Sequence, residues 1–146
     1  MCIRDRNTGG VTKKTYSDKN TIASGTTAAG AALTLTFTNH PFYAKIVAQL
    51  IDNDDNEVST MLIDVAGGER GGDVAPLPIA LGPISIFGNT STNPWSSTVA
   101  VTQNTVVLTP STDFSAGDGS YSIFIEYISP ETAGALTSIN SVNFGY

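Results

Sequence analysis

The sequence predicts an all-β protein, an antiparallel β-sandwich or jelly roll of about seven or eight strands. Three observations support this fold class. The chain contains 19 Thr and 14 Ser among 146 residues, and threonine favours pleated surfaces over helix interiors. Apolar and polar residues alternate along several segments, as in strands with one buried face. Clusters of turn-forming residues separate these segments, and no segment has a convincing helical pattern.

The length and composition fit one domain with its own core. At about 150 residues a domain buries roughly 70% of its unfolded surface, so it needs neither disulfides nor a metal for stability. The formal net charge is −6, which argues against nucleic-acid binding because phosphate contacts need clustered cations. No run approaches the roughly 18 apolar residues of a membrane span, so we expect no membrane insertion.

Residues 1–6 differ in composition from the rest of the chain. Their sequence, MCIRDR, resembles a translated sequencing adapter, and we exclude them from the fold as an artefact of that kind. The alternative is a genuine short basic N-terminus. Excluding them removes two of the seven cations, one of the 13 acids and the single cysteine, which leaves a net charge of −7. Disulfides, thiolate metal sites and cysteine nucleophiles are then ruled out.

Residues 7–30 are rich in Gly, Thr, Ser, Ala and Asn and predict an N-terminal arm outside the sandwich. Such an arm is either a frayed terminus or a segment that docks on a neighbouring subunit. In the second case its cations and its tyrosine are interface candidates, namely Lys13, Lys14, Tyr16 and Lys19. We expect the sandwich domain itself to span residues 31–146.

The first half of the predicted sandwich contains three strands. Residues 31–38 alternate between apolar residues and threonine, and the sequence Asn-His-Pro at 39–41 ends the strand. Residues 42–51 are almost continuously apolar and predict a buried central strand, although a helix would align Phe42, Ile46 and Leu50 equally well. Residues 58–65 resume the alternation, so we expect a hairpin with a five-residue acidic loop.

The longest break in the strand pattern covers residues 66–83. It contains four glycines within residues 67–72, and long loops of this kind are usually functional or mobile. The loop lacks the Lys and Ser/Thr of a phosphate-binding loop. Its Arg70 is the only cation from residue 46 to the C-terminus, so it is an interface candidate for an ion pair between subunits, with a solvated side chain as the alternative.

The second half continues with short strands. Residues 84–88 predict one strand, and residues 95–101 and 105–109 predict a hairpin. Residues 121–128 are apolar on both faces, which is typical of a central strand. A last, weak strand is expected from residue 136 to about residue 144.

We find no catalytic constellation in the sequence. His40 is the only histidine, and no nucleophile-elbow motif surrounds any serine, so a Ser-His-Asp triad is not indicated. Glu126 is the one carboxylate that we expect in the middle of a strand, and nothing in the sequence pairs it with a second acid. We therefore expect no enzymatic activity and no cofactor.

The acidic loop is a candidate for a weak Ca²⁺ site. Its carboxylates are hard oxygen ligands of the kind that Ca²⁺ prefers, at Asp52, Asp54, Asp55 and Glu57. The glycine and terminal glutamate of an EF-hand loop are missing at the required spacing. The alternative interpretation is a solvated hairpin tip whose Asp and Asn residues form the turn.

Trp95 follows a loop at the start of a predicted strand. Such a residue is either a platform on which a sugar ring stacks or an anchor in the core. It is therefore also an interface candidate. A secreted carbohydrate-binding module that uses Trp95 and the loop at 52–57, with Ca²⁺, is one alternative function.

The strands and turns of residues 30–130 resemble β-rich virion proteins of tailed marine phages. The segments that carry the resemblance are FYAKIVAQLI at 42–51, EVSTMLI at 57–63, the hairpin at 95–110 and SYSIFIEY at 120–127. The resemblance implies a non-enzymatic head decoration (cement) protein that binds and reinforces the capsid surface, or alternatively a tail-fibre or collar domain. No catalytic residue is carried over.

The resemblance also implies partners and a location. We expect binding to the major capsid protein or other virion proteins, at the extracellular virion surface, with a glycan as an alternative ligand. A homo-oligomer is expected, with a trimer favoured. Symmetric assembly would bury the second apolar faces of the central strands, if the sandwich leaves them open, at Val47, Ile51, Phe124 and Ile128.

Overall fold

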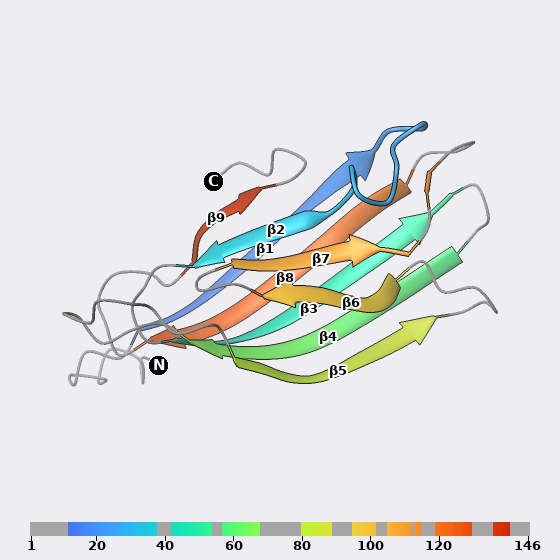
Figure 1. The fold of residues 1–146 in the computed structure, drawn as a ribbon. Helices are drawn as coiled ribbons and strands as arrows, with labels where there is room; N and C mark the ends of the chain where they lie inside the picture. The colour runs from blue at the N-terminus through green and yellow to red at the C-terminus, as the bar shows by residue number, and fades with distance from the viewer. Residues whose placement is uncertain are drawn as a thin grey trace.

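The computed structural model describes residues 12–37, 42–53, 57–67, 80–88, 95–101, 105–111, 113–114, 119–129 and 136–140. Within these residues the chain forms nine strands in two antiparallel sheets, one in front of the other (Figure 1). This confirms the predicted antiparallel β-sandwich. The adapter-like residues 1–6 lie outside the described residues, as do His40, Asp54, Asp55 and Arg70.

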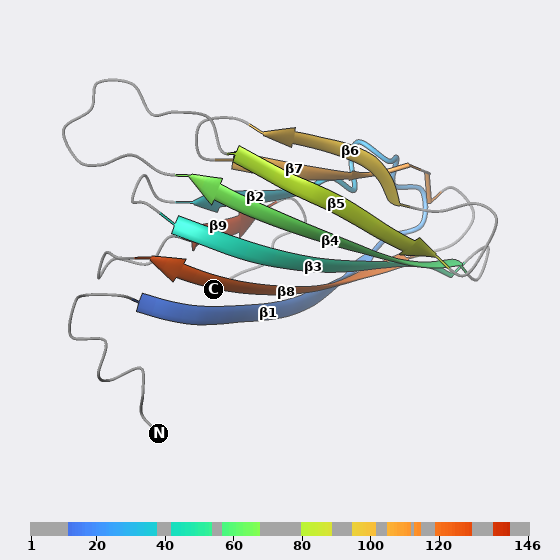
Figure 2. The ribbon, with the colours of Figure 1, turned by 90° about the horizontal axis from the view of Figure 1, so that it is seen from below.

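The large sheet has five strands, side by side in Figure 2. Their order is β1 (Thr12–Ile22), β8 (Gly119–Ser129), β3 (Phe42–Asp52), β4 (Glu57–Gly67) and β5 (Ala80–Gly88). The small sheet has four strands, in the order β6 (Trp95–Val101), β7 (Thr105–Pro110), β2 (Leu33–Phe37) and β9 (Leu136–Asn140). The chain therefore changes sheet between β1 and β2, β2 and β3, β5 and β6, β7 and β8, and β8 and β9.

Most strand predictions are confirmed. Residues 42–51 lie in a strand and not in a helix, and β3 pairs with β4 without interruption from Phe42↔Gly67 to Asp52↔Glu57. The hairpin of β6 and β7 is also present. β8 pairs with β1 on one side and β3 on the other, so the strand that is apolar on both faces is an interior strand of its sheet.

The prediction of an arm over residues 7–30 needs a correction. Residues 12–22 form β1, which pairs with β8 along its whole length from Thr12↔Ser129 to Ile22↔Gly119. Large hydrophobic residues are rare here because β1 is an edge strand and turns only one face to the core. Lysines on such an edge oppose pairing with foreign strands.

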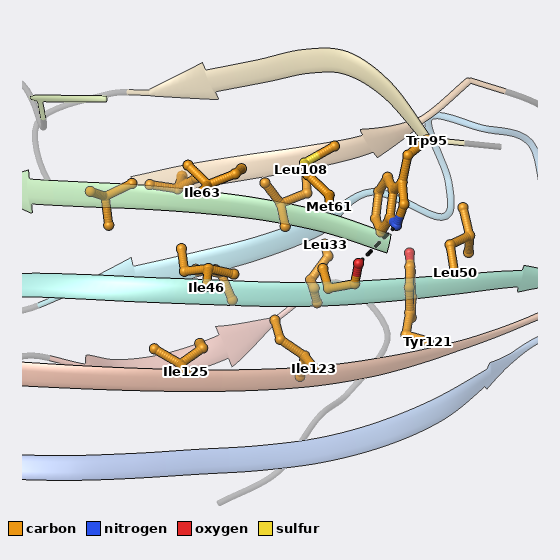
Figure 3. Close-up of a cluster of buried hydrophobic side chains, with 14 of the residues drawn as sticks. Leu33, Ile46, Leu50, Met61, Ile63, Trp95, Leu108, Tyr121, Ile123 and Ile125 are labelled. Carbon is orange, nitrogen blue, oxygen red and sulfur yellow. Dashed lines mark hydrogen bonds between the residues drawn. The ribbon is translucent and has the colours of Figure 1, made fainter. Parts of the chain in front are cut away.

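The core fills the space between the two sheets (Figure 3). Its side chains come from alternate positions of facing strands, as expected from the two-residue period of a strand. They include Leu33, Ile46, Leu50, Met61, Ile63, Leu108, Ile123 and Ile125, each at most 3% exposed. The described residues include no helix that is long and apolar enough to cross a membrane.

The link between β1 and β2 is fastened to the segment before β8. Thr26 and Phe114 form an isolated antiparallel bridge, and the amide of Ala28 donates to Asp113 Oδ1 at 2.6 Å. Gly25 adopts a φ of 89°, in the left-handed region that favours glycine. The ring of Phe114 is fully buried, so the link belongs to the body of the sandwich.

Candidate interaction surface

The side of the large sheet that faces away from the core is the main surface feature of the molecule. We call it the outer face, and it carries the odd-numbered residues of β1 (from Thr15) and of β3, the even-numbered residues of β4 and β8, and Ser85 and Phe87 of β5. Among the described residues no element packs over it, because the small sheet covers the opposite side. Within the part of the chain that the structure describes, the outer face is therefore uncovered.

The strand register aligns the outer face in rows that run across the strands. The central row joins Phe124 of β8, Val47 of β3 and Leu62 of β4, and we call it the apolar row. One step further along the strands, a charged row joins Glu126, Lys45 and Asp64. On the other side of the apolar row, a polar row joins Ser122, Gln49 and Thr60.

Two further rows close the pattern and are again mainly apolar. Beyond the charged row lie Ile128, Tyr43 and Ala66, and beyond the polar row lie Ser120, Ile51 and Val58. The exposed fractions are 43% for Phe124, 43% for Ile128 and 41% for Tyr43. Large apolar side chains thus remain accessible at the centre and at one end of the outer face, and Phe87 of β5, 61% exposed beside Thr60, adds another at its edge.

The polar groups of the outer face hold one another in place. The hydroxyl of Tyr43 donates to Asp64 Oδ1 at 3.0 Å, and Gln49 Nε2 donates to Thr60 Oγ1 at 3.3 Å. The hydrogen bond to Asp64, with partial desolvation and the negative charges of Asp64 and Glu126, raises the pKa of the Tyr43 phenol. A tyrosine phenol is protonated at neutral pH in any case, and the raised pKa keeps Tyr43 a donor to Asp64 further into the alkaline range.

Shallow depressions lie on both sides of Asp64. One of about 240 Å³ is lined by Tyr43, Ala66, Leu81 and neighbouring residues, and one of about 200 Å³ is lined by Lys45, Leu62 and Pro83, among others. Small-molecule sites are usually deeper clefts of about 300–1,000 Å³. On the β1 side, two depressions beside Lys19 and Ser122 have volumes of about 310 and 320 Å³, at the lower end of that range.

The structure places Trp95 in the core and corrects its selection as an interface residue. Its side chain is 1% exposed, its Nε1 donates to the carbonyl oxygen of Ala48 at 3.2 Å, and its ring stacks on Tyr121 (Figure 3). A ring enclosed in this way offers no platform to a sugar. Trp95 is an anchor that ties β6 of the small sheet to β3 of the large one.

The other interface candidates lie on or near β1. Tyr16 turns inward and stacks on Tyr127, so its ring is used within the chain. Lys19 is exposed at the β1 rim of the outer face. The backbones of Lys13 and Lys14 pair with β8, while their side chains, like all of Arg70, lie outside what the structure describes.

The structure describes two of the four residues that are candidates for calcium binding. Asp52 and Glu57 are cross-strand neighbours at the end of the β3–β4 hairpin, 2% and 6% exposed. Asp54 and Asp55 lie outside the described residues. Within the part of the chain that is described, no group of three or more His, Cys, Asp or Glu side chains gathers to hold a metal ion.

Reasoning from the sequence missed the charged row. Glu126 was expected to stand alone in mid-strand, but the register places it beside Lys45, with Asp64 on the other side of that lysine. Asp64 also lies well inside a strand, because β4 continues to Gly67. Lys45 and Glu126 were visible in the sequence, but which strands are neighbours was not.

Comparisons with known proteins add one structural likeness. No protein-family model matches the chain, and no curated protein matches it significantly. Among solved structures, the chain is similar to the crystal structure of the Acinetobacter baumannii phage AM24 tailspike protein, with a TM-score of 0.36 and 11% sequence identity. The match covers 86% of this chain but only 28% of the tailspike chain. A likeness at this level carries no argument about function.

Proposed function

We propose that this chain is a non-enzymatic structural protein of a phage virion surface, and specifically a head decoration protein that binds and reinforces the capsid. The outer face is the observation that carries the proposal. The exposed Phe124 and the half-buried Val47 and Leu62 lie in a row across its centre, with charged and polar rows on either side, and contiguous apolar patches of this kind mark interaction sites. The strand-and-turn resemblance over residues 30–130 supplies the class of assembly.

The regular pairing of the large sheet suits a protein that has to resist mechanical deformation of a capsid. β1, β3, β4 and β8 are each 11 residues long, and their mutual pairings run without a bulge. Trp95 fastens the small sheet across the core. A rigid plate of this kind presents its interface without a cost for ordering, which favours binding.

A tail-fibre or collar domain is the second candidate within the same class, because it too would act through an assembly surface. Subunit number separates the two. A decoration protein is present in hundreds of copies per virion, whereas a fibre or collar is present in few. The carbohydrate-binding alternative loses its stacking platform because Trp95 is buried.

The test is the composition of virions of the phage that encodes the chain. Quantitative mass spectrometry should find the chain at a copy number comparable with that of the major capsid protein, and a cryo-EM map should place it on the head. A low copy number at the tail would favour the fibre or collar function instead. Absence of the chain from purified virions would refute both.

A matched pair of variants links the outer face to this function. Val47→Asp puts a charge at the centre of the apolar row and should reduce incorporation into virions at least about tenfold. Ala100→Asp puts the same charge on an exposed position of the small sheet and should leave incorporation unchanged. Equal incorporation of both variants would show that assembly uses another surface.

A further inference from the structure

We propose that the outer face binds a second copy of this chain, packed face to face about a two-fold axis that runs across the strands along the apolar row. The inference rests on the proposed function: the outer face joins two copies into the unit that assembles on the virion, and the capsid contact lies elsewhere on the dimer. It goes further by naming that partner and the direction of the symmetry axis. The result is a dimer and not the trimer that the sequence favoured.

The order of the rows is the first argument. Along β3 the outward residues are Tyr43, Lys45, Val47, Gln49 and Ile51, which read apolar, charged, apolar, polar, apolar. The same order holds along β4, from Ala66 to Val58. The pattern is nearly symmetric about the apolar row, so a copy turned end over end about that row meets a matching pattern.

A two-fold axis across the strands places each strand opposite the same strand of the second copy. The two facing strands run in opposite directions. Lys45 then faces Gln49 of the second copy, Glu126 faces Ser122, and Asp64 faces Thr60. Every charged group meets an uncharged side chain that carries a hydrogen-bonding group suited to it. Tyr43 faces Ile51, and Phe124, Val47 and Leu62 each face themselves.

An axis along the strands gives the opposite result. With the axis on β3, Lys45 would face Lys45 of the second copy, and Glu126 would face Asp64. Like charges placed opposite each other in an interface cost several kcal/mol and exclude wrong arrangements. The charged row therefore excludes a strand-parallel axis centred on β3. A strand-parallel axis between β3 and β8 would set Lys45 opposite Glu126 of the second copy, but it leaves β5 outside the contact and buries less surface than an axis across the strands.

The size of the outer face also fits a second copy. With strands about 4.8 Å apart and residues about 3.4 Å apart, five strands over the length from Tyr43 to Ile51 project to roughly 650 Å². A stable interface of standard size buries about 800 Å² of accessible surface on each partner. Sheets that pack face to face keep their strand directions within about 30° of each other, and an axis across the strands satisfies this.

Single cysteines test both the partner and the axis. In a background with Cys2→Ser, Phe124→Cys should cross-link to itself, because the axis passes close to residue 124. Lys45→Cys alone should give no cross-linked dimer, whereas a mixture of Lys45→Cys and Gln49→Cys should give one. Efficient self-linking of Lys45→Cys, or linking of Phe124→Cys only when mixed with Leu62→Cys, would overturn the proposed axis.

Sedimentation equilibrium tests the partner without cysteines. The wild-type chain should dimerise, Val47→Asp should raise the dimer dissociation constant about 100-fold or more, and Ala100→Asp should not change it. Circular dichroism establishes that both variants are folded. A monomeric wild type at about 100 μM would overturn the inference, and so would a dimer that Val47→Asp leaves intact.

The inference and the proposed function fail in different ways. If the chain is abundant on virions but monomeric in solution, and Phe124→Cys gives no cross-link, the proposed function stands and the dimer is refuted. If the chain forms the predicted cross-links but is absent from virions, the dimer stands and the virion function is refuted.

Discussion

Tyr16 of β1 stacks on Tyr127 of β8, with ring centroids 5.8 Å apart and ring planes inclined by 10°. The two residues lie on the inner face of the large sheet, and Tyr127 is two residues along β8 from Ile125, the register partner of Tyr16. Tyr127 is fully buried and Tyr16 covers it from the edge of the sheet. The first strand therefore closes one side of the core.

Removal of this ring should weaken the fold. Tyr16→Ala loses an aromatic stack and buried apolar area, so we expect a loss of about 2 kcal/mol in the free energy of unfolding, measured by denaturant titration of Trp95 fluorescence. Ser17→Ala, on the exposed side of the same strand, should change stability by less than about 0.5 kcal/mol. If residues 7–30 were a free arm, both variants would unfold at the same midpoint as the wild type.

Gly119 lies where β8 begins and has no room for a side chain. A Cβ atom there would lie 2.5 Å from Cε1 of Phe114 and 2.6 Å from the carbonyl oxygen of Ile51. We expect Gly119→Ala to cost about 2–3 kcal/mol of stability, because either the ring or the backbone of β3 must move. In Gly30→Ala the nearest contact is Thr27 Oγ1 at 3.2 Å, and the loss should be smaller than in Gly119→Ala. Equal losses in both variants would contradict this explanation.

The hydroxyl of Ser59 is buried on the inner face of β4, and within the described part of the chain it has no hydrogen-bond partner. Because burying a hydroxyl without a partner is costly, Ser59→Ala should raise the free energy of unfolding by up to about 1 kcal/mol. Thermal unfolding followed by circular dichroism measures the gain. Ser122→Ala, on the exposed face of β8, serves as the reference with no gain. Destabilisation by Ser59→Ala would reveal a partner for the hydroxyl.

Burial raises the pKa of the Tyr121 phenol well above its usual value of about 10. Above pH 10 the unfolded chain releases this proton while the folded chain keeps it, so the unfolded state binds fewer protons and stability falls as pH rises. The contribution of Tyr121 to this slope is at most about 1.4 kcal/mol per pH unit. We expect Tyr121→Phe to lose stability less steeply than the wild type between pH 10 and 11.5, in urea titrations at each pH. Parallel curves for the two proteins would contradict this assignment.

A strand could be predicted from the sequence where its buried residues contrast in hydrophobicity with their neighbours or where a long run is apolar. Clear alternation in residues 33–37 and the apolar run at 42–51 were sufficient to predict β2 and β3. β1 was missed because its inward residues include Asp18 and Asn20 as well as Tyr16 and Ile22, so the alternation has little contrast in hydrophobicity. An edge strand tolerates such residues because solvent reaches its open side.

The candidate surface was only half predictable. Phe124 and Ile128 could be recognised as a second apolar face from β8 alone. The charged row could not, since it exists only because β3 has β4 on one side and β8 on the other. Glu126 and Lys45 are 81 residues apart in the chain, and nothing local in the sequence indicates that they are cross-strand neighbours.

The pairing of β1 with β8 also has a consequence for how the chain folds. Their partnered residues are about 100 positions apart, and contacts of such long range form slowly because a large loop must close first. We expect β1 to remain unpaired during folding until β8 has paired with β3. During that time it is an open edge that could capture other unfolded chains, and positive charge along a strand opposes such capture. Three of the seven cations lie in β1, at Lys13, Lys14 and Lys19, and this placement protects the chain while it folds.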